Sequence, residues 1–209
     1  MLEDSALTFL ISGILLGAGS GITPGPLNTL IISESLKQGK MSGIKIALAP
    51  LLTDGFIILY ALLLVNELSK VGFIIGGITI AGAFFIIYLG IKDLRGVLKV
   101  NDDSTLSTGA LLKGIITNVF TPYPHIFWIT VGAPIIIKAY QINPLYSLLF
   151  LTGFYVLLVG FKILLALFTD KMRTIIKQKN YRRVIKFLGA LLIIFGTLLL
   201  YDGIKKILF

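Results

Sequence analysis

The chain has 209 residues, 56% of them hydrophobic, and a mean hydropathy of +0.94, which excludes a water-soluble globular domain. Its formal net charge of +9 would suit a nucleic-acid partner, but the basic residues gather between apolar segments, so we expect no nucleic acid and interpret the charge as an orientation signal. The absence of cysteine excludes disulfides and thiolate metal sites.

Six apolar segments are long enough to cross the hydrocarbon core of a bilayer, which takes about 20 helical residues. Four of them carry no charged side chain: residues 5–33, 71–91, 114–137 and 139–161. Two carry one acid each, residues 46–66 with Asp54 and residues 187–204 with Asp202. We therefore predict an all-α integral membrane protein with six transmembrane helices, forming one membrane domain over residues 1–209.

The first segment contains a proline pair, Thr23-Pro24-Gly25-Pro26. Proline removes a backbone donor and clashes with the preceding helical turn, and lipid offers no water to satisfy the freed carbonyl groups. Residues 7–36 would also measure about 45 Å as one straight helix, against a core of roughly 30 Å. We expect two half-helices here, the second beginning near Pro26.

A second proline pair, Thr121-Pro122-Tyr123-Pro124, begins 98 residues after the first and lies in the fourth segment. The same argument predicts a break within residues 118–124, followed by a new half-helix near Pro124.

The two halves of the chain also end alike. Residues 88–92 read YLGIK and residues 201–205 read YDGIK, and Gly76 corresponds to Gly189 at the same offset of 113 residues. Because each copy has three spans, the second copy inserts upside down relative to the first. We predict a 3+3 inverted-topology repeat, residues 1–99 and 109–209, with spans one and four broken at the proline motifs.

The basic residues are unevenly placed. Of the 19 Lys and Arg, Lys162 lies within a span, four lie on one face (Lys70, Lys138, Lys205 and Lys206), and the other 14 follow spans one, three and five. The positive-inside rule then places both termini outside in a multi-pass plasma-membrane protein whose bilayer contacts are part of its environment.

Broken membrane helices line cavities, and the N-terminus of a half-helix presents free N–H groups to an anion such as a carboxylate. We predict a small-molecule site near the bilayer midplane between the two breaks. The candidate substrate-binding residues are Thr23, Pro24, Gly25, Pro26, Asn28, Asp54, Asn118, Thr121, Pro122, Tyr123, Pro124 and His125. The alternative for the threonines and asparagines is that they only satisfy the broken backbone, and for His125 a packing role.

Asp54 is the sharpest candidate, because an intramembrane carboxylate commonly marks a functional site. Low-dielectric surroundings favour the neutral form of a carboxyl group in general, which suits proton uptake and release during transport. We predict Asp54 and Lys162 as proton-coupling residues. The alternatives are that Asp54 binds an amino group of the cargo, that the two form a structural ion pair, or that Lys162 reaches toward the cytoplasm.

Other residues are expected to be less specific. One histidine without an acidic cluster makes no metal site, so we predict no metal, no cofactor and no catalytic residue. Trp128 and the phenylalanines are expected to face lipid or the membrane interface.

Several motifs occur in a characteristic order: Gly21-Ile22-Thr23-Pro24-Gly25-Pro26, then Asp54, then residues 88–95, then Gly114-Ile115-Ile116-Thr117-Asn118 through Pro122. In this combination the chain resembles the LysE/RhtB-type amino-acid exporters over nearly its whole length. The resemblance implies a six-span secondary transporter, not an enzyme, whose export of an amino acid or related small metabolite is coupled to protons.

The wider superfamily that this resemblance points to includes other chemistries. Thiol electron carriers are excluded by the lack of cysteine. Divalent metal cation efflux is the alternative function, disfavoured because Asp54 is the one acid expected deep in the membrane, and a membrane scaffold is a third. The sequence leaves open the substrate, the transport direction, the coupling ion and the oligomeric state, a homo-oligomer included.

Overall fold

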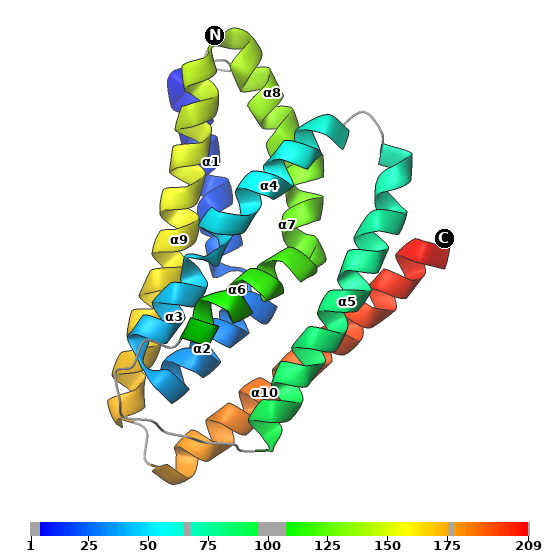
Figure 1. The fold of residues 1–209 in the computed structure, drawn as a ribbon. Helices are drawn as coiled ribbons and strands as arrows, with labels where there is room; N and C mark the ends of the chain where they lie inside the picture. The colour runs from blue at the N-terminus through cyan, green and yellow to red at the C-terminus, as the bar shows by residue number, and fades with distance from the viewer. Residues whose placement is uncertain (1–4, 65–67, 96–107, 176–177, 209) are drawn as a thin grey trace.

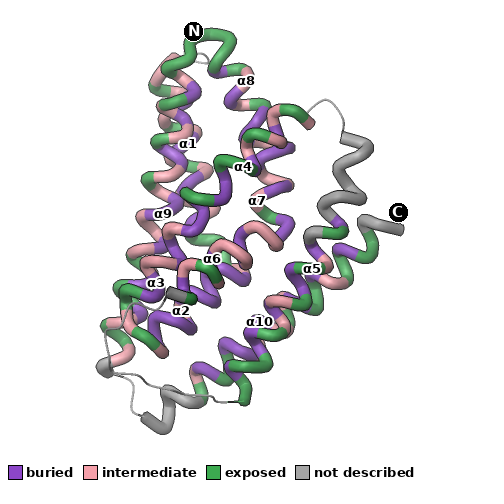
Figure 2. The backbone as a smooth tube through the Cα atoms, in the orientation of Figure 1, coloured by how far each residue is buried: buried purple, intermediate pink, exposed green. Residues whose placement is uncertain are grey.

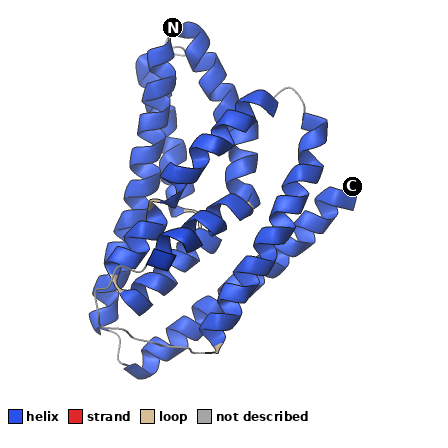
Figure 3. Ribbon diagram, viewed as in Figure 1, coloured by secondary structure: helices blue, strands red, loops and turns tan. Residues whose placement is uncertain are grey.

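The computed structural model describes residues 5–64, 68–95, 108–175 and 178–208, and within these ranges the regular structure is helical, with no strand (Figure 3). The all-α prediction is therefore confirmed for the described part of the chain. In chain order the helices are α1 (Ala6–Ile22), α2 (Pro26–Gln38), α3 (Lys40–Ala47), α4 (Ala49–Leu64), α5 (Leu68–Leu94), α6 (Thr108–Phe120), α7 (Pro122–Phe127), the π-helical turn η1 (Trp128–Gly132), α8 (Ala133–Ile142), α9 (Pro144–Ile175) and α10 (Gln178–Leu208).

Two long helix pairs frame the molecule. Helix α1 packs along α9, and α5 packs along α10, while α4, α6 and α7 lie between the two pairs (Figure 1). Figure 2 shows that buried residues follow the inward faces of these helices and that exposed residues follow the outward faces. Exposed residues include large apolar side chains such as Phe56, Leu63 and Phe168, as expected for a surface that meets lipid.

Within the described residues, four helical stretches are long and apolar enough to cross a membrane: Lys40–Leu64, Pro122–Ile142, Pro144–Arg173 and Arg183–Lys205. The bent pair α1 and α2 makes a fifth when it is counted as one span. The protein is thus a multi-pass membrane protein. The predicted span at residues 71–91 falls within α5, where part of the side chains lies outside the described set.

The chain leaves helical geometry at both proline motifs. Helix α1 ends at Ile22, and α2 begins at Pro26 with a bend of 60° between the two axes. Helix α6 ends at Phe120, and α7 begins at Pro122, two residues before the predicted start at Pro124. Both prolines of this second motif lie in the first turn of α7, where backbone N–H groups have no intrahelical partner and their loss is tolerated.

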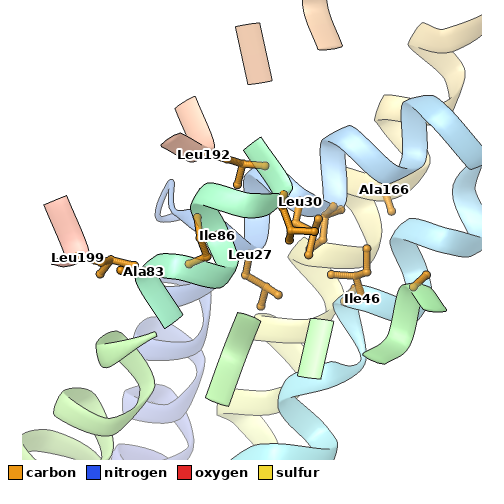
Figure 4. Packing of buried hydrophobic residues seen from close by; sticks show 12 residues of the cluster. Leu27, Leu30, Ile46, Ala83, Ile86, Ala166, Leu192 and Leu199 are labelled. Carbon is orange, nitrogen blue, oxygen red and sulfur yellow. The ribbon is translucent and has the colours of Figure 1, made fainter. Parts of the chain in front are cut away.

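The half-helix α2 is buried among neighbours from both halves of the chain. Leu27 and Leu30 of α2 belong to an apolar cluster with Ile46 of α3, Ile86 of α5 and Leu192 of α10 (Figure 4). A half-helix that makes apolar contacts on several sides has its position fixed by tertiary packing, since its own 13 residues are marginal as an isolated helix.

Two further acids, Glu34 and Asp93, are buried between helices. The expectation that Asp54 is the one acid deep in the membrane stays a prediction. Glu34 of α2 is 2% exposed and accepts a hydrogen bond from Lys113 Nζ of α6 at 2.7 Å. Asp93 of α5 is 5% exposed and pairs with Lys37 of α2. Each acid has a basic partner on another helix, so this network ties α2, α5 and α6 together.

Glycine allows the closest helix contacts. A Cβ atom at Gly13 or Gly17 of α1 would lie 2.2 Å from the carbonyl oxygen of Phe150 or Phe154 in α9. Between α5 and α10, a Cβ atom at Gly90 would lie 2.6 Å from the carbonyl oxygen of Gly189. The backbones of both pairs therefore approach to distances that only glycine permits.

Replacing Gly17 with alanine should separate α1 from α9, because the added methyl group meets backbone rather than a movable side chain. We expect Gly17→Ala to destabilise the protein by about 1–3 kcal/mol. The matched control is Gly19→Ala in the same helix, where an added Cβ has no neighbour within 4 Å and stability should be unchanged or slightly higher. Thermal unfolding in detergent measures both, and equal melting temperatures for the two variants would contradict this packing.

Candidate functional site

A cavity of about 450 Å³ lies between the two helix breaks. This volume falls within the range of roughly 300–1,000 Å³ that is usual for small-molecule sites. Its walls come from α1, α2, α4, α6, α7, η1 and α9. The lining residues are Ser20, Thr23, Pro24, Gly25, Pro26, Leu27, Asn28, Pro50, Asp54, Asn118, Thr121, Tyr123, Pro124, Ile126, Phe127, Trp128, Phe154, Leu158 and Lys162.

Asp54 reaches this cavity from α4 and is 3% exposed. Asn118, at the end of α6, donates from Nδ2 to Asp54 Oδ1 at 2.7 Å and to Thr53 Oγ1 at 2.7 Å. Trp128 Nε1 donates to the other carboxylate oxygen, Oδ2, at 3.3 Å. The second break therefore fixes the position of the buried carboxylate.

Lys162 reaches the cavity from α9 and is 5% exposed. Its Nζ donates to Asn28 Oδ1 at 2.7 Å. Asn28 in turn donates from Nδ2 to the carbonyl oxygens of Gly21 at 3.0 Å and Thr23 at 2.9 Å. Asn28 thus satisfies carbonyl groups at the end of α1 and also holds the buried lysine, so its backbone and cavity roles coexist.

The two threonines bond to the backbone that precedes each break. Thr23 Oγ1 donates to the carbonyl oxygen of Gly19 at 2.7 Å, and Thr121 Oγ1 donates to that of Asn118 at 3.2 Å. Both residues also line the cavity. Their hydroxyl groups therefore stabilise the helix ends, as in the backbone alternative, while their side chains form part of the cavity wall.

Among the predicted binding residues, only Pro122 and His125 lie off the lining of this cavity, within the described part of the chain. His125 is buried, stacks against Tyr60 and hydrogen-bonds both to the Tyr60 hydroxyl group and to the carbonyl oxygen of Val119. These contacts fit the packing role that the sequence offered as its alternative. Tyr123, by contrast, lines the cavity and is 58% exposed.

Asp54 and Lys162 share the cavity without pairing directly. Across the residues that the structure describes, no ion pair joins the two side chains, and each instead bonds to the asparagine of one break. The cavity thus contains a carboxylate and an ammonium group that are held apart from each other.

The sequence placed Trp128, one of the residues that line the cavity, wrongly. It is fully buried rather than facing lipid, and its ring lies 5.0 Å from that of Phe154 in an edge-to-face contact. Phe127 stacks on Phe154 as well, with ring centroids 5.1 Å apart. The one signal that pointed here was spacing, since Trp128 lies one helical turn after Pro124. The three rings form the apolar side of the cavity.

The LysE type translocator family matches residues 20–203 of this chain. The chain belongs to the LysE family. This family comprises membrane transport proteins rather than enzymes, and the matched region includes both helix breaks and both cavity charges. A relative named "Putative amino acid efflux protein YcgF" from Bacillus subtilis (strain 168) is 24% identical over 211 residues, 97% of this chain and 100% of the relative. No solved structure matches the chain.

Among the described residues of this LysE-family chain, no group of three or more His, Cys, Asp and Glu side chains is placed to hold a metal ion. Asp54 has an amide, an indole and a hydroxyl group as neighbours instead of further acids. The cavity is therefore equipped with hydrogen-bond donors and apolar surface.

The role of Asn28 at the break can be tested with Asn28→Asp. The new carboxylate can still pair with Lys162, but it can no longer donate to the carbonyl groups of Gly21 and Thr23. Leaving a buried carbonyl group unsatisfied costs about 1–3 kcal/mol, so we expect a clear loss of stability despite the retained ion pair.

The control for that substitution is Thr29→Val, which removes a hydrogen bond to the Gly25 carbonyl oxygen that also accepts the Thr29 backbone N–H. This change should cost no more than about 1 kcal/mol. Both variants are compared by thermal unfolding in detergent. If Asn28→Asp has the same melting temperature as the wild type, the asparagine does not stabilise the break.

Proposed function

We propose that this protein is a secondary transporter that exports an amino acid or a related small metabolite, coupled to protons. The observation that carries the proposal is the cavity between two helix breaks, with Asp54 and Lys162 buried in its wall. Intramembrane charges that face a cavity commonly mark substrate or proton pathways. Membership of the LysE family and the name of the Bacillus subtilis relative support amino-acid export.

We propose a binding mode in which the carboxylate of the cargo lies near the start of α2 and Lys162. The N-terminus at Pro26 presents free N–H groups and a partial positive charge, and Lys162 adds a full charge beside it. The first turn of α7 adds one free N–H group, that of Tyr123, because Pro122 and Pro124 have none. Asp54 on the other side binds either the amino group of the cargo or the coupling proton.

The transport cycle that we propose uses an inverted repeat of residues 1–99 and 109–209, with six spans in one membrane domain and both termini outside. Contacts between α5 and α10 support this repeat. Gly90 meets Gly189, Gly203 meets Gly76, and Gly196 meets Ala83. The offset of 113 residues exchanges the first two contacts with each other and maps the third onto itself, as a pseudo-twofold axis through Ala83 and Gly196 requires. Rocking of one repeat against the other would expose the cavity alternately.

Transport by purified protein in proteoliposomes tests this function. With an imposed proton gradient, Asp54→Asn should lower amino-acid flux at least tenfold and remove its dependence on pH, because the neutral amide neither pairs with an ammonium group nor carries a proton. The matched control is Asp202→Asn, since Asp202 lies exposed near the end of α10 and away from the cavity.

Wild-type flux and an unchanged pH profile in Asp54→Asn would contradict the role of this residue. Flux of Zn²⁺, Mn²⁺ or Cd²⁺ that depends on Asp54, with no amino-acid flux, would replace the proposal by metal efflux.

A further inference from the structure

The wall of the cavity also restricts the side chain of the cargo, an inference that rests on the proposed function. Among the described residues that line the cavity, Asp54 and Lys162 are the charged ones. One negative and one positive group balance each other, so the empty site has no net charge to offer to a third ionised group.

Both charges retain capacity to bind a ligand. An ammonium group has three donors, and Lys162 Nζ has one partner among the described residues, Asn28 Oδ1. A carboxylate can accept about four hydrogen bonds. Asp54 accepts from Asn118, Thr53, Tyr155 and Trp128, and the bond from Trp128 is long at 3.3 Å, so an ammonium group of the cargo would compete with that weak donor. Because the two groups bond to different asparagines rather than to each other, a ligand with both a carboxylate and an ammonium group can pair with each of them.

The rest of the wall is largely apolar. Trp128, Phe127 and Phe154 form its aromatic side, and Leu27, Ile126 and Leu158 add aliphatic surface. The uncharged polar groups of the lining belong mainly to the two breaks, where Asn28, Asn118, Thr23 and Thr121 already bond to backbone or to the cavity charges. A charged side chain of the cargo would face hydrocarbon without a counter-charge.

We propose that the cargo is an α-amino acid whose side chain is uncharged and apolar, and that basic and acidic amino acids are rejected. The backbone charges of the amino acid pair with Lys162 and Asp54, and its side chain occupies the space beside Trp128 and Phe154. Because their side-chain charge would be unpaired in the membrane interior, lysine and glutamate should bind at least roughly 50-fold more weakly than leucine. Each methylene group of the cargo that is buried in the cavity should raise the binding affinity roughly fourfold, so glycine should also bind weakly.

The test uses the full chain, purified in detergent and reconstituted in proteoliposomes. Counterflow of labelled L-leucine is competed with unlabelled L-leucine, L-lysine, L-glutamate and glycine over a range of concentrations. We expect half-maximal competition by leucine at a concentration at least 50-fold below those of lysine and glutamate. The melting temperature in detergent should rise with leucine at concentrations where lysine has no effect, since a ligand stabilises the folded state that binds it.

A pair of variants tests whether the net charge of the cavity lining sets this selectivity. Ile126→Glu adds a carboxylate to the apolar wall, whereas Ile126→Gln adds a side chain of the same shape without the charge. The lysine concentration that gives half-maximal competition should be at least tenfold lower for Ile126→Glu than for Ile126→Gln. The wild-type competition series stands by itself if either variant fails to fold.

The outcomes separate this inference from the function on which it rests. Competition by lysine or glutamate as strong as that by leucine overturns the restriction to apolar side chains while amino-acid export stands. Transport of lysine alone does the same. No flux and no stabilisation with any amino acid overturns both.

Discussion

The structure depends on one constraint, that polar backbone groups freed inside a membrane must find partners within the protein. Two proline motifs interrupt helices, and at each interruption an asparagine side chain bonds to neighbouring groups. Asn28 donates to carbonyl groups at the end of α1 and accepts from Lys162, and Asn118 donates to Asp54 and Thr53. At the first break one side chain, Asn28, both satisfies the broken backbone and positions a buried charge, so the backbone and the electrostatics of the cavity are set together there. At the second break the two tasks are divided: Thr121 bonds to the backbone and Asn118 positions Asp54.

The bonds between the two charges and the two breaks suggest how binding of the cargo is connected to movement of the two halves of the chain. Lys162 belongs to α9 and Asp54 to α4, and each is tied to a break in the other half of the chain. A cargo that bridges the two charges would link the halves through the same contacts. The network of Glu34, Lys37, Asp93 and Lys113 is a second connection between helices, and it involves α2 and α6, the two half-helices that flank the breaks.

The helix ends could be predicted from local chemistry, whereas the contacts between distant parts of the fold could not. The ends at Ile22 and Phe120 follow from the effect of proline on the preceding turn, which acts over a few residues. Asp54 and Asn28 stood out because polar groups in apolar segments need partners, but the identity of those partners depends on helix packing. Trp128 was misplaced because lipid and a buried cavity favour the same apolar residues. Glu34 and Lys113 looked like ordinary charges near helix ends, and only tertiary structure brings them together.

The most direct test of the account is whether the cargo occupies the cavity between the breaks. The chain has no cysteine, so Ser20→Cys places one thiol in the cavity wall and Gln141→Cys places one at an exposed position outside it. The rate of modification by a membrane-permeant thiol reagent is measured with and without a saturating concentration of a transported amino acid. The account predicts that the amino acid slows modification at position 20 and leaves position 141 unaffected. Equal rates at position 20 with and without the amino acid would contradict it.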